Sequence, residues 1–229
     1  MINIAVFIAA LASYALFLAR FAWNVIVWFR SPNGDSTMLS ERMRKSSLPC
    51  ISTLLDILFF RRIFRSSKSL WPGSWIFHLA FVFVLLRHLK FIFPSLPDCL
   101  IALQPLGLVA GYLLPFSLLY IIALRSVRKK ERYTSFYNYG IAVMLFLVST
   151  SGLIMRLFFR VDQSSVKYFS LGIVTLRPHA IPDNPLFLFH ILTVMLLLPN
   201  LPLHLIAAPF VLFNANRREE ELRYMIHEE

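Results

Sequence analysis

The chain has 229 residues, is 58% hydrophobic and carries 23 Lys and Arg against 12 Asp and Glu, for a formal net charge of +11. A mean hydropathy of +0.66 indicates a polytopic membrane protein and argues against a soluble domain. Because the basic residues lie in loops between apolar segments, we interpret the charge as a positive-inside bias and not as affinity for nucleic acid.

The two cysteines, Cys50 and Cys99, are far apart and form no CxxC or CxxCH motif. This pattern excludes a covalent c-type haem, and it leaves too few thiolates for a cysteine-ligated iron–sulfur cluster. No basic segment precedes the first apolar run, so we expect no cleaved signal peptide.

Five apolar segments are long enough to cross a bilayer as helices. They cover residues 2–29, 71–93, 100–124, 137–159 and 185–213. Residues 47–65 mix leucine and isoleucine with arginine, which predicts an amphipathic helix on the membrane surface. Residues 160–183 are expected to form a polar loop, and residues 214–229 a charged cytoplasmic tail. The predicted fold is an all-α membrane protein, a single integral-membrane domain over residues 1–229.

The distribution of positive charge predicts the orientation of these five spans. The side that holds the first long loop, the RSVRKKER loop and the tail carries 17 of the 23 lysines and arginines, and the other side carries 6. By the positive-inside rule the richer side is cytoplasmic. We therefore expect an outer N-terminus and a cytoplasmic C-terminus, in the cytoplasmic (inner) membrane.

Four histidines lie within the second and fifth spans. His78 and His88 are ten residues apart, so they differ by about 15 Å in depth and cannot share one metal ion. His190 and His204 are about four turns apart and lie on nearly the same helix face. Because the two spans run in opposite directions, the depths pair His88 with His190 near the outer face and His78 with His204 near the cytoplasmic face.

This pairing fits two bis-histidine b haems stacked between the second and fifth helices, since neutral imidazoles are good axial ligands of haem iron. The alternative is that all four are hydrogen-bonded packing histidines, which the matched depths disfavour. A zinc site is disfavoured as well, because three or four ligands would have to converge at one depth. No span contains a carboxylate.

Four basic residues lie at the outer ends of spans, against the charge bias: Arg87, Lys90, Arg156 and Arg160. Haem propionates require cations or polar donors nearby. We count Arg87 and Arg156 as cofactor-binding candidates, and Arg156 is favoured because it lies deeper and follows a glycine. Snorkelling to the headgroups accounts equally well for the other two. Arg20, near the inner end of the first span, is expected to snorkel or to reach an acidic cofactor group.

With these features the chain resembles a di-haem cytochrome b family. This family includes the gamma subunit of respiratory nitrate reductase and the membrane subunits of heterodisulfide-reductase-like complexes, among them the small cytochrome of the high-molecular-weight cytochrome complex of sulfate reducers. The resemblance covers nearly the whole chain and rests on the spacing of His78 and His88, the TSGLIMR stretch at 150–156 and the PNLPLH segment at 199–204. The fifth span departs from the family in the shorter spacing of its two histidines.

The resemblance implies a respiratory electron-transfer subunit of an oxidoreductase complex, not catalytic alone. Menaquinone or ubiquinone would react near the outer haem, and electrons would cross to the inner haem and a cytoplasmic iron–sulfur subunit. The family leaves open further membrane subunits and extracytoplasmic cytochrome c subunits. Arg87, Lys90 and His179 are candidates for the quinone pocket, although a solvent-exposed loop histidine is the better interpretation of His179.

Two other classes stay open. A non-haem membrane anchor of a redox complex would use the same spans without a cofactor. A small transporter is disfavoured because no inverted repeat is visible and the intramembrane ionisable groups are imidazoles and arginines.

Overall fold

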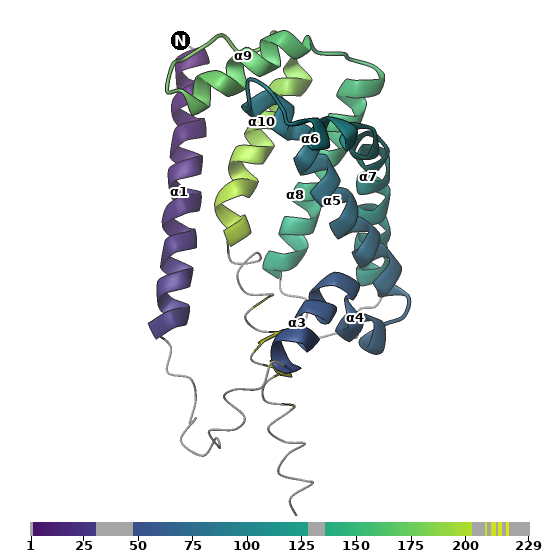
Figure 1. Ribbon diagram of the computed structural model, residues 1–229. Helices are drawn as coiled ribbons and strands as arrows, with labels where there is room; N and C mark the ends of the chain where they lie inside the picture. The colour runs from purple at the N-terminus through teal and green to yellow at the C-terminus, as the bar shows by residue number, and fades with distance from the viewer. Residues whose placement is uncertain are drawn as a thin grey trace, which may run out of the picture.

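The computed structural model describes residues 2–30, 48–127, 136–202, 209, 212–213, 215–216 and 219. Within these residues every regular element is a helix, and there is no strand (Figure 1). Helices suit a lipid environment because they satisfy their backbone polar groups internally. The helices are α1 (Ile2–Arg30), α3 (Leu48–Phe59), α4 (Arg61–Ser66), α5 (Leu70–Ile92), α6 (Asp98–Ala102), α7 (Gln104–Val127), α8 (Phe136–Leu157), α9 (Gln163–Val174) and α10 (Pro185–Leu197).

Four of the described helices are long and apolar enough to cross a membrane: Asn3–Val27 within α1, and α5, α7 and α8. Large apolar side chains cover their outward faces, with Trp23 and Phe116 each 65% exposed. Such surfaces are typical of lipid contact and not of water contact. The chain is therefore a multi-pass, all-helical membrane protein. The fifth crossing stays a prediction, because α10 is a shorter apolar helix and residues 203–208 lie outside the described part of the chain.

The long helices run alternately up and down, as Figure 1 shows, with α9 across the end where the chain begins and α3 and α4 at the opposite end. α5 packs along α7, α7 along α8, and α8 along α10, while α1 packs against α10. One apolar core joins α5, α7, α8 and Leu197. A second core joins α1, α9 and α10 around the fully buried Phe169.

The contact of α5 with α7 depends on a glycine. A Cβ at Gly107 would lie 2.7 Å from the Cβ of Arg87 and 2.8 Å from the carbonyl oxygen of Phe83, so a larger residue would force the helices apart. Gly111, one turn further along α7, faces open space. Gly107 is therefore the glycine that permits the close approach of the two helices.

One surface helix was predicted over residues 47–65, but the described residues of this segment, from Leu48 onward, form two. α3 and α4 meet at Phe60, whose φ of 50° lies in the left-handed region and interrupts the helix. The indole N–H groups of Trp71 and Trp75, in the first turns of α5, donate to the carbonyl oxygens of Phe59 (2.8 Å) and Leu58 (3.2 Å). These bonds satisfy orphan carbonyls at the end of α3 and hold it against the base of α5.

The expectation of a polar loop over residues 160–183 is wrong, because the loop contains α9. Asp162 caps this helix, accepting from the backbone N–H groups of Ser164 (3.3 Å) and Ser165 (2.9 Å). Val166, Phe169 and Ile173 recur at helical spacing and pack into the second core. The polar residues of the segment occupy the other face, so composition alone suggested a loop.

The fifth span is interrupted at Pro199. α10 ends at Leu197, and a 3₁₀ turn, η2 (Leu198–Asn200), follows it before the helix resumes at residues 201–202. Proline cannot donate the backbone hydrogen bond that an α-helix requires at this position. The Arg20 guanidinium of α1 donates to the Pro199 carbonyl oxygen and to the Asn200 Oδ1, both at 3.1 Å, and so fastens α1 to this turn.

Candidate functional site

The two histidines of α5 are held by the same kind of hydrogen bond. The Nδ1 of His78 lies 2.7 Å from the carbonyl oxygen of Ser74, and the Nδ1 of His88 lies 2.7 Å from that of Val84. A carbonyl oxygen can only accept, so Nδ1 carries the proton in each ring. In the neutral imidazole the lone pair then belongs to Nε2, which is the arrangement of a metal-ligating histidine whose other nitrogen is fixed by a hydrogen bond.

His190, in α10, is held in the same tautomer by a hydrogen bond to a side chain. Its Nδ1 lies 2.9 Å from the Oγ of Ser151 in α8, and this hydroxyl donates to the carbonyl oxygen of Val148 at 2.9 Å. A serine hydroxyl has one hydrogen, and Ser151 donates it to the carbonyl oxygen of Val148. The Nδ1–H of His190 is therefore the donor in the bond between His190 and Ser151. The Nε2 of His190 again holds the lone pair.

The structure brings His88 and His190 together. The two imidazoles are close enough to interact electrostatically. Both lie toward the α9 end of the bundle, whereas His78 lies toward α4, with the ring of Phe60 4.5 Å from its own. His204, the predicted partner of His78, lies outside the described residues, so this second pair has one described member.

The helices that carry His88 and His190 are held apart by others. Among the described residues, α5 packs closely against α7 and α9, and α10 packs closely against α8, but α5 and α10 are not closely packed on each other. Two ligands of one flat macrocycle must approach it from opposite faces, which requires such a separation. The arrangement of helices therefore fits a ring held between His88 and His190.

A cluster of three cations lies near this pair. Arg156 interacts electrostatically with both Arg87 and Lys90. Arg87 donates to the carbonyl oxygen of Gln104 at 2.7 Å, and the Nζ of Lys90 donates to the Gln163 Oε1 at 3.0 Å. None of the three forms an ion pair with a carboxylate of the described residues. Like charges gathered in this way favour an anionic group between them, such as a propionate.

The face of α8 next to His190 is small and polar. A Cβ at Gly152 would lie 3.4 Å from the Cε1 of His190, so the imidazole rests directly on this glycine. In the same turn of α8, on another face, the Oγ1 of Thr150 is buried without a hydrogen-bond partner among the described residues. A buried hydroxyl without a partner is costly, which is consistent with a missing polar group nearby. The residues around His88 and His190 thus fit a b haem.

Two of the residues singled out in the sequence have no described contact with the histidine pair. His179 is exposed in the loop that follows α9, which confirms the preferred interpretation of a solvent-exposed loop histidine. Its imidazole stands beside Tyr168, with ring centroids 6.3 Å apart, and its Cδ2 would lie 2.7 Å from a Cβ at Gly172. Arg20 bonds η2, as described above, and neither of its predicted roles is needed to explain it.

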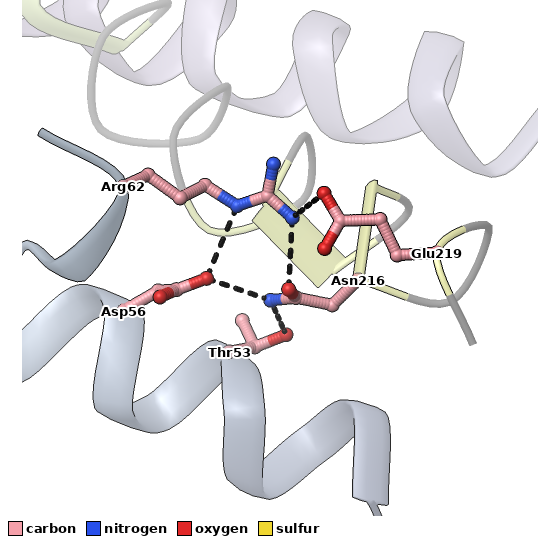
Figure 2. A network of polar contacts seen from close by, with 5 residues as sticks. All are labelled: Thr53, Asp56, Arg62, Asn216 and Glu219. Carbon is pink, nitrogen blue, oxygen red and sulfur yellow. Dashed lines mark hydrogen bonds and ion pairs between the residues drawn. The ribbon is translucent and has the colours of Figure 1, made fainter. Parts of the chain in front are cut away.

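A second polar site ties the surface helices to the C-terminal part of the chain (Figure 2). Buried Asp56 accepts from the Nε of Arg62 (3.1 Å) and from the Nδ2 of Asn216 (3.0 Å), and Asn216 also donates to Thr53 (3.1 Å). Arg62 in turn donates to the Oδ1 of Asn216 (2.8 Å) and pairs with Glu219 (2.9 Å). A cavity of about 130 Å³ adjoins this network.

The fold and the site define a class: a multi-pass helical membrane protein with anchored imidazoles on two of its helices. No protein-family model and no solved structure matches the chain. Two curated proteins, each named an Hdr-like menaquinol oxidoreductase cytochrome b-like subunit, are similar to it. The protein of Archaeoglobus profundus is 26% identical over 66% of this chain and 54% of its own length. The protein of Archaeoglobus fulgidus is 26% identical over 65% of this chain and 53% of its own length.

The chain spans about half the length of the curated relatives it matches. Their names support the Hdr-type, that is heterodisulfide-reductase-type, part of the predicted resemblance. The link to the gamma subunit of nitrate reductase stays a prediction.

Proposed function

We propose that this chain is the cytochrome b subunit of a membrane-bound menaquinol oxidoreductase complex, and that it conducts electrons across the membrane through two bis-histidine b haems. The observation that carries the proposal is the pair of His88 and His190, which interact electrostatically from separated helices with each Nδ1–H already engaged. The names of the two relatives support the quinol and the complex.

In this proposal His88 and His190 are the ligands near the outer face, and His78 and His204 those near the cytoplasmic face. A haem bound at each level supplies a one-electron redox centre. The described part of the chain orients three of these imidazoles: the bonds from Nδ1 keep the Nε2 of His78 and His88 directed away from the carbonyl oxygens of α5, and that of His190 directed away from Ser151 of α8. Arg156 balances the charge of the outer propionates.

Quinol oxidation belongs at the outer end of α5 in this proposal, where Arg87 and Lys90 stand beside His88. Both side chains are hydrogen-bonded, to Gln104 and Gln163 respectively, which fixes their charges near the end of the helix. The opposite end, with α3, α4 and the basic segments, is the surface for a cytoplasmic iron–sulfur subunit. The N-terminus is outside, as the charge distribution predicts.

The test is reduction of the protein by quinol. Membrane vesicles containing the chain are treated with a menaquinol analogue, and reduction of the b haems is followed in the visible spectrum, in the wild type and in His88→Ala. The proposal predicts rapid reduction in the wild type and its loss in the variant. Equal reduction in both would contradict it, and a wild type without any haem band would favour a non-haem anchor subunit.

A further inference from the structure

Ser151 is a side chain that bonds the Nδ1 of a candidate ligand, His190. His78 and His88 use backbone carbonyl oxygens of their own helix for this contact, at 2.7 Å each. His190 uses the hydroxyl of Ser151, which belongs to another helix and is 3% exposed. His190 also interacts with the backbone of Val148, so Ser151 is the part of this anchor that can be replaced without altering α10 or the backbone of α8.

The hydroxyl is itself fixed. Because the Oγ–H of Ser151 is donated to the carbonyl oxygen of Val148 at 2.9 Å, a lone pair of the oxygen faces His190. The result is a relay of two hydrogen bonds, from His190 to Ser151 and from Ser151 to Val148. A bond of this kind raises the basicity of the ring at its other nitrogen and sets its rotation.

We propose that Ser151 is a positioning residue that sets the reduction potential of the outer haem by holding His190 in its ligating tautomer. The inference rests on the proposed function. A more basic imidazole stabilises ferric iron relative to ferrous iron, so the intact relay lowers the potential of this haem. The inner haem, for which His78 near α4 is the described ligand, is unaffected by the relay.

The experiment is a redox titration of the purified chain with its haems bound, followed by optical spectra and by the low-spin ferric EPR signal. In Ser151→Ala the reduction potential of the outer haem rises by up to about 59 mV. For a one-electron couple this corresponds to about a tenfold change in the reduction equilibrium constant. The EPR signal of the same haem shifts. Ser151→Thr, which keeps a hydroxyl, restores both values toward the wild type.

Ser149→Ala is the matched control. Ser149 is a neighbouring serine of α8 whose hydroxyl donates to the carbonyl oxygen of Phe146 at 3.0 Å. Its loss leaves both potentials unchanged. An unchanged outer potential in Ser151→Ala with full haem content would overturn the inference while leaving the proposed function intact, and so would an equal shift in both variants. A wild type that binds no haem would refute the proposed function itself.

Discussion

At the scale of single residues, the anchoring of Nδ1 is the feature most relevant to function. The relative depths of the histidines could be predicted from the sequence, because depth along a helix follows from residue number. The contact of His190 with Ser151 could not be predicted. Ser149, Thr150 and Ser151 all carry hydroxyls, and only the rotation of α8 relative to α10 decides which of them faces the imidazole. The ligand roles of the four histidines stay predictions.

Gly152 gives a prediction at the same scale. A Cβ there would lie 3.4 Å from His190, an ordinary contact, so Gly152→Ala should keep both haems. Gly152→Val adds two further methyl groups toward the imidazole and should displace it, with loss of most of the outer haem. Haem content per chain, measured as pyridine haemochrome, checks this. Full outer-haem occupancy in the valine variant would show that His190 does not need this space.

At the scale of elements, amphipathic patterns were harder to interpret than apolar spans. The spans were recognisable because an apolar run long enough to cross a bilayer is typical of a membrane helix and rare in soluble domains. α9 was missed because serine, lysine and glycine interrupt its apolar residues, and only the periodicity of those residues marks a helix. The break between α3 and α4 was missed because Phe60 is a residue type that seldom adopts a positive φ.

Asp162 makes the stability of α9 depend on pH. Hydrogen bonds from the Ser165 hydroxyl, and then from the backbone N–H groups of Ser165 and Ser164, hold the pKa of Asp162 below its usual value. A lowered pKa means that the cap contributes fully above the unfolded pKa of about 3.9 and is lost as the pH falls through the folded value. Hydrogen exchange should show protection of the first turn of α9 near neutral pH and its loss in acid.

Two variants separate this effect from general acid sensitivity. Asp162→Asn retains a capping side chain without an ionisable group, so the acid-dependent loss of protection should disappear. Asp162→Ala removes the cap and should leave the first turn unprotected at every pH. Identical pH profiles in the wild type and the asparagine variant would exclude Asp162 as the cause.

The network of Figure 2 gives a prediction about the link between α3 and the C-terminal part of the chain. Asn216→Ala removes one donor from buried Asp56 and one acceptor from Arg62, and should cost about 1–3 kcal/mol of stability. Thermal unfolding of the purified protein in detergent measures the loss. Ser52→Ala, which lines the adjoining cavity outside the drawn network, is the control and should unfold like the wild type. Equal unfolding temperatures for all three proteins would show that the network contributes nothing.

At the scale of the whole molecule, the sequence predicted a helical membrane protein with ligands at two depths. The class of the fold is confirmed, and four of the five predicted crossings correspond to described helices of sufficient length. The orientation in the membrane is a property of the chain and its surroundings together, so it stays a prediction from charge. Which helices touch could not be predicted, because it depends on side-chain packing between segments distant in the sequence.

The two native cysteines test the orientation. Cys50 in α3 and Cys99 in α6 are both exposed. Helices α3 and α6 lie at opposite ends of the bundle (Figure 1). A membrane-impermeant maleimide applied to intact cells should label Cys99 and spare Cys50. The variants Cys50→Ser and Cys99→Ser assign the labelled site. Labelling of Cys50 alone would reverse the proposed orientation.

The most direct test of the central claim is the haem content of the purified chain, from the reduced-minus-oxidised spectrum and pyridine haemochrome, in the wild type, His88→Ala and His204→Ala. Two b haems per chain, with each variant losing a different one, is the predicted result. One haem, lost in only one variant, would contradict the pairing on the fifth span. The absence of any haem from the wild type would contradict the cytochrome account altogether.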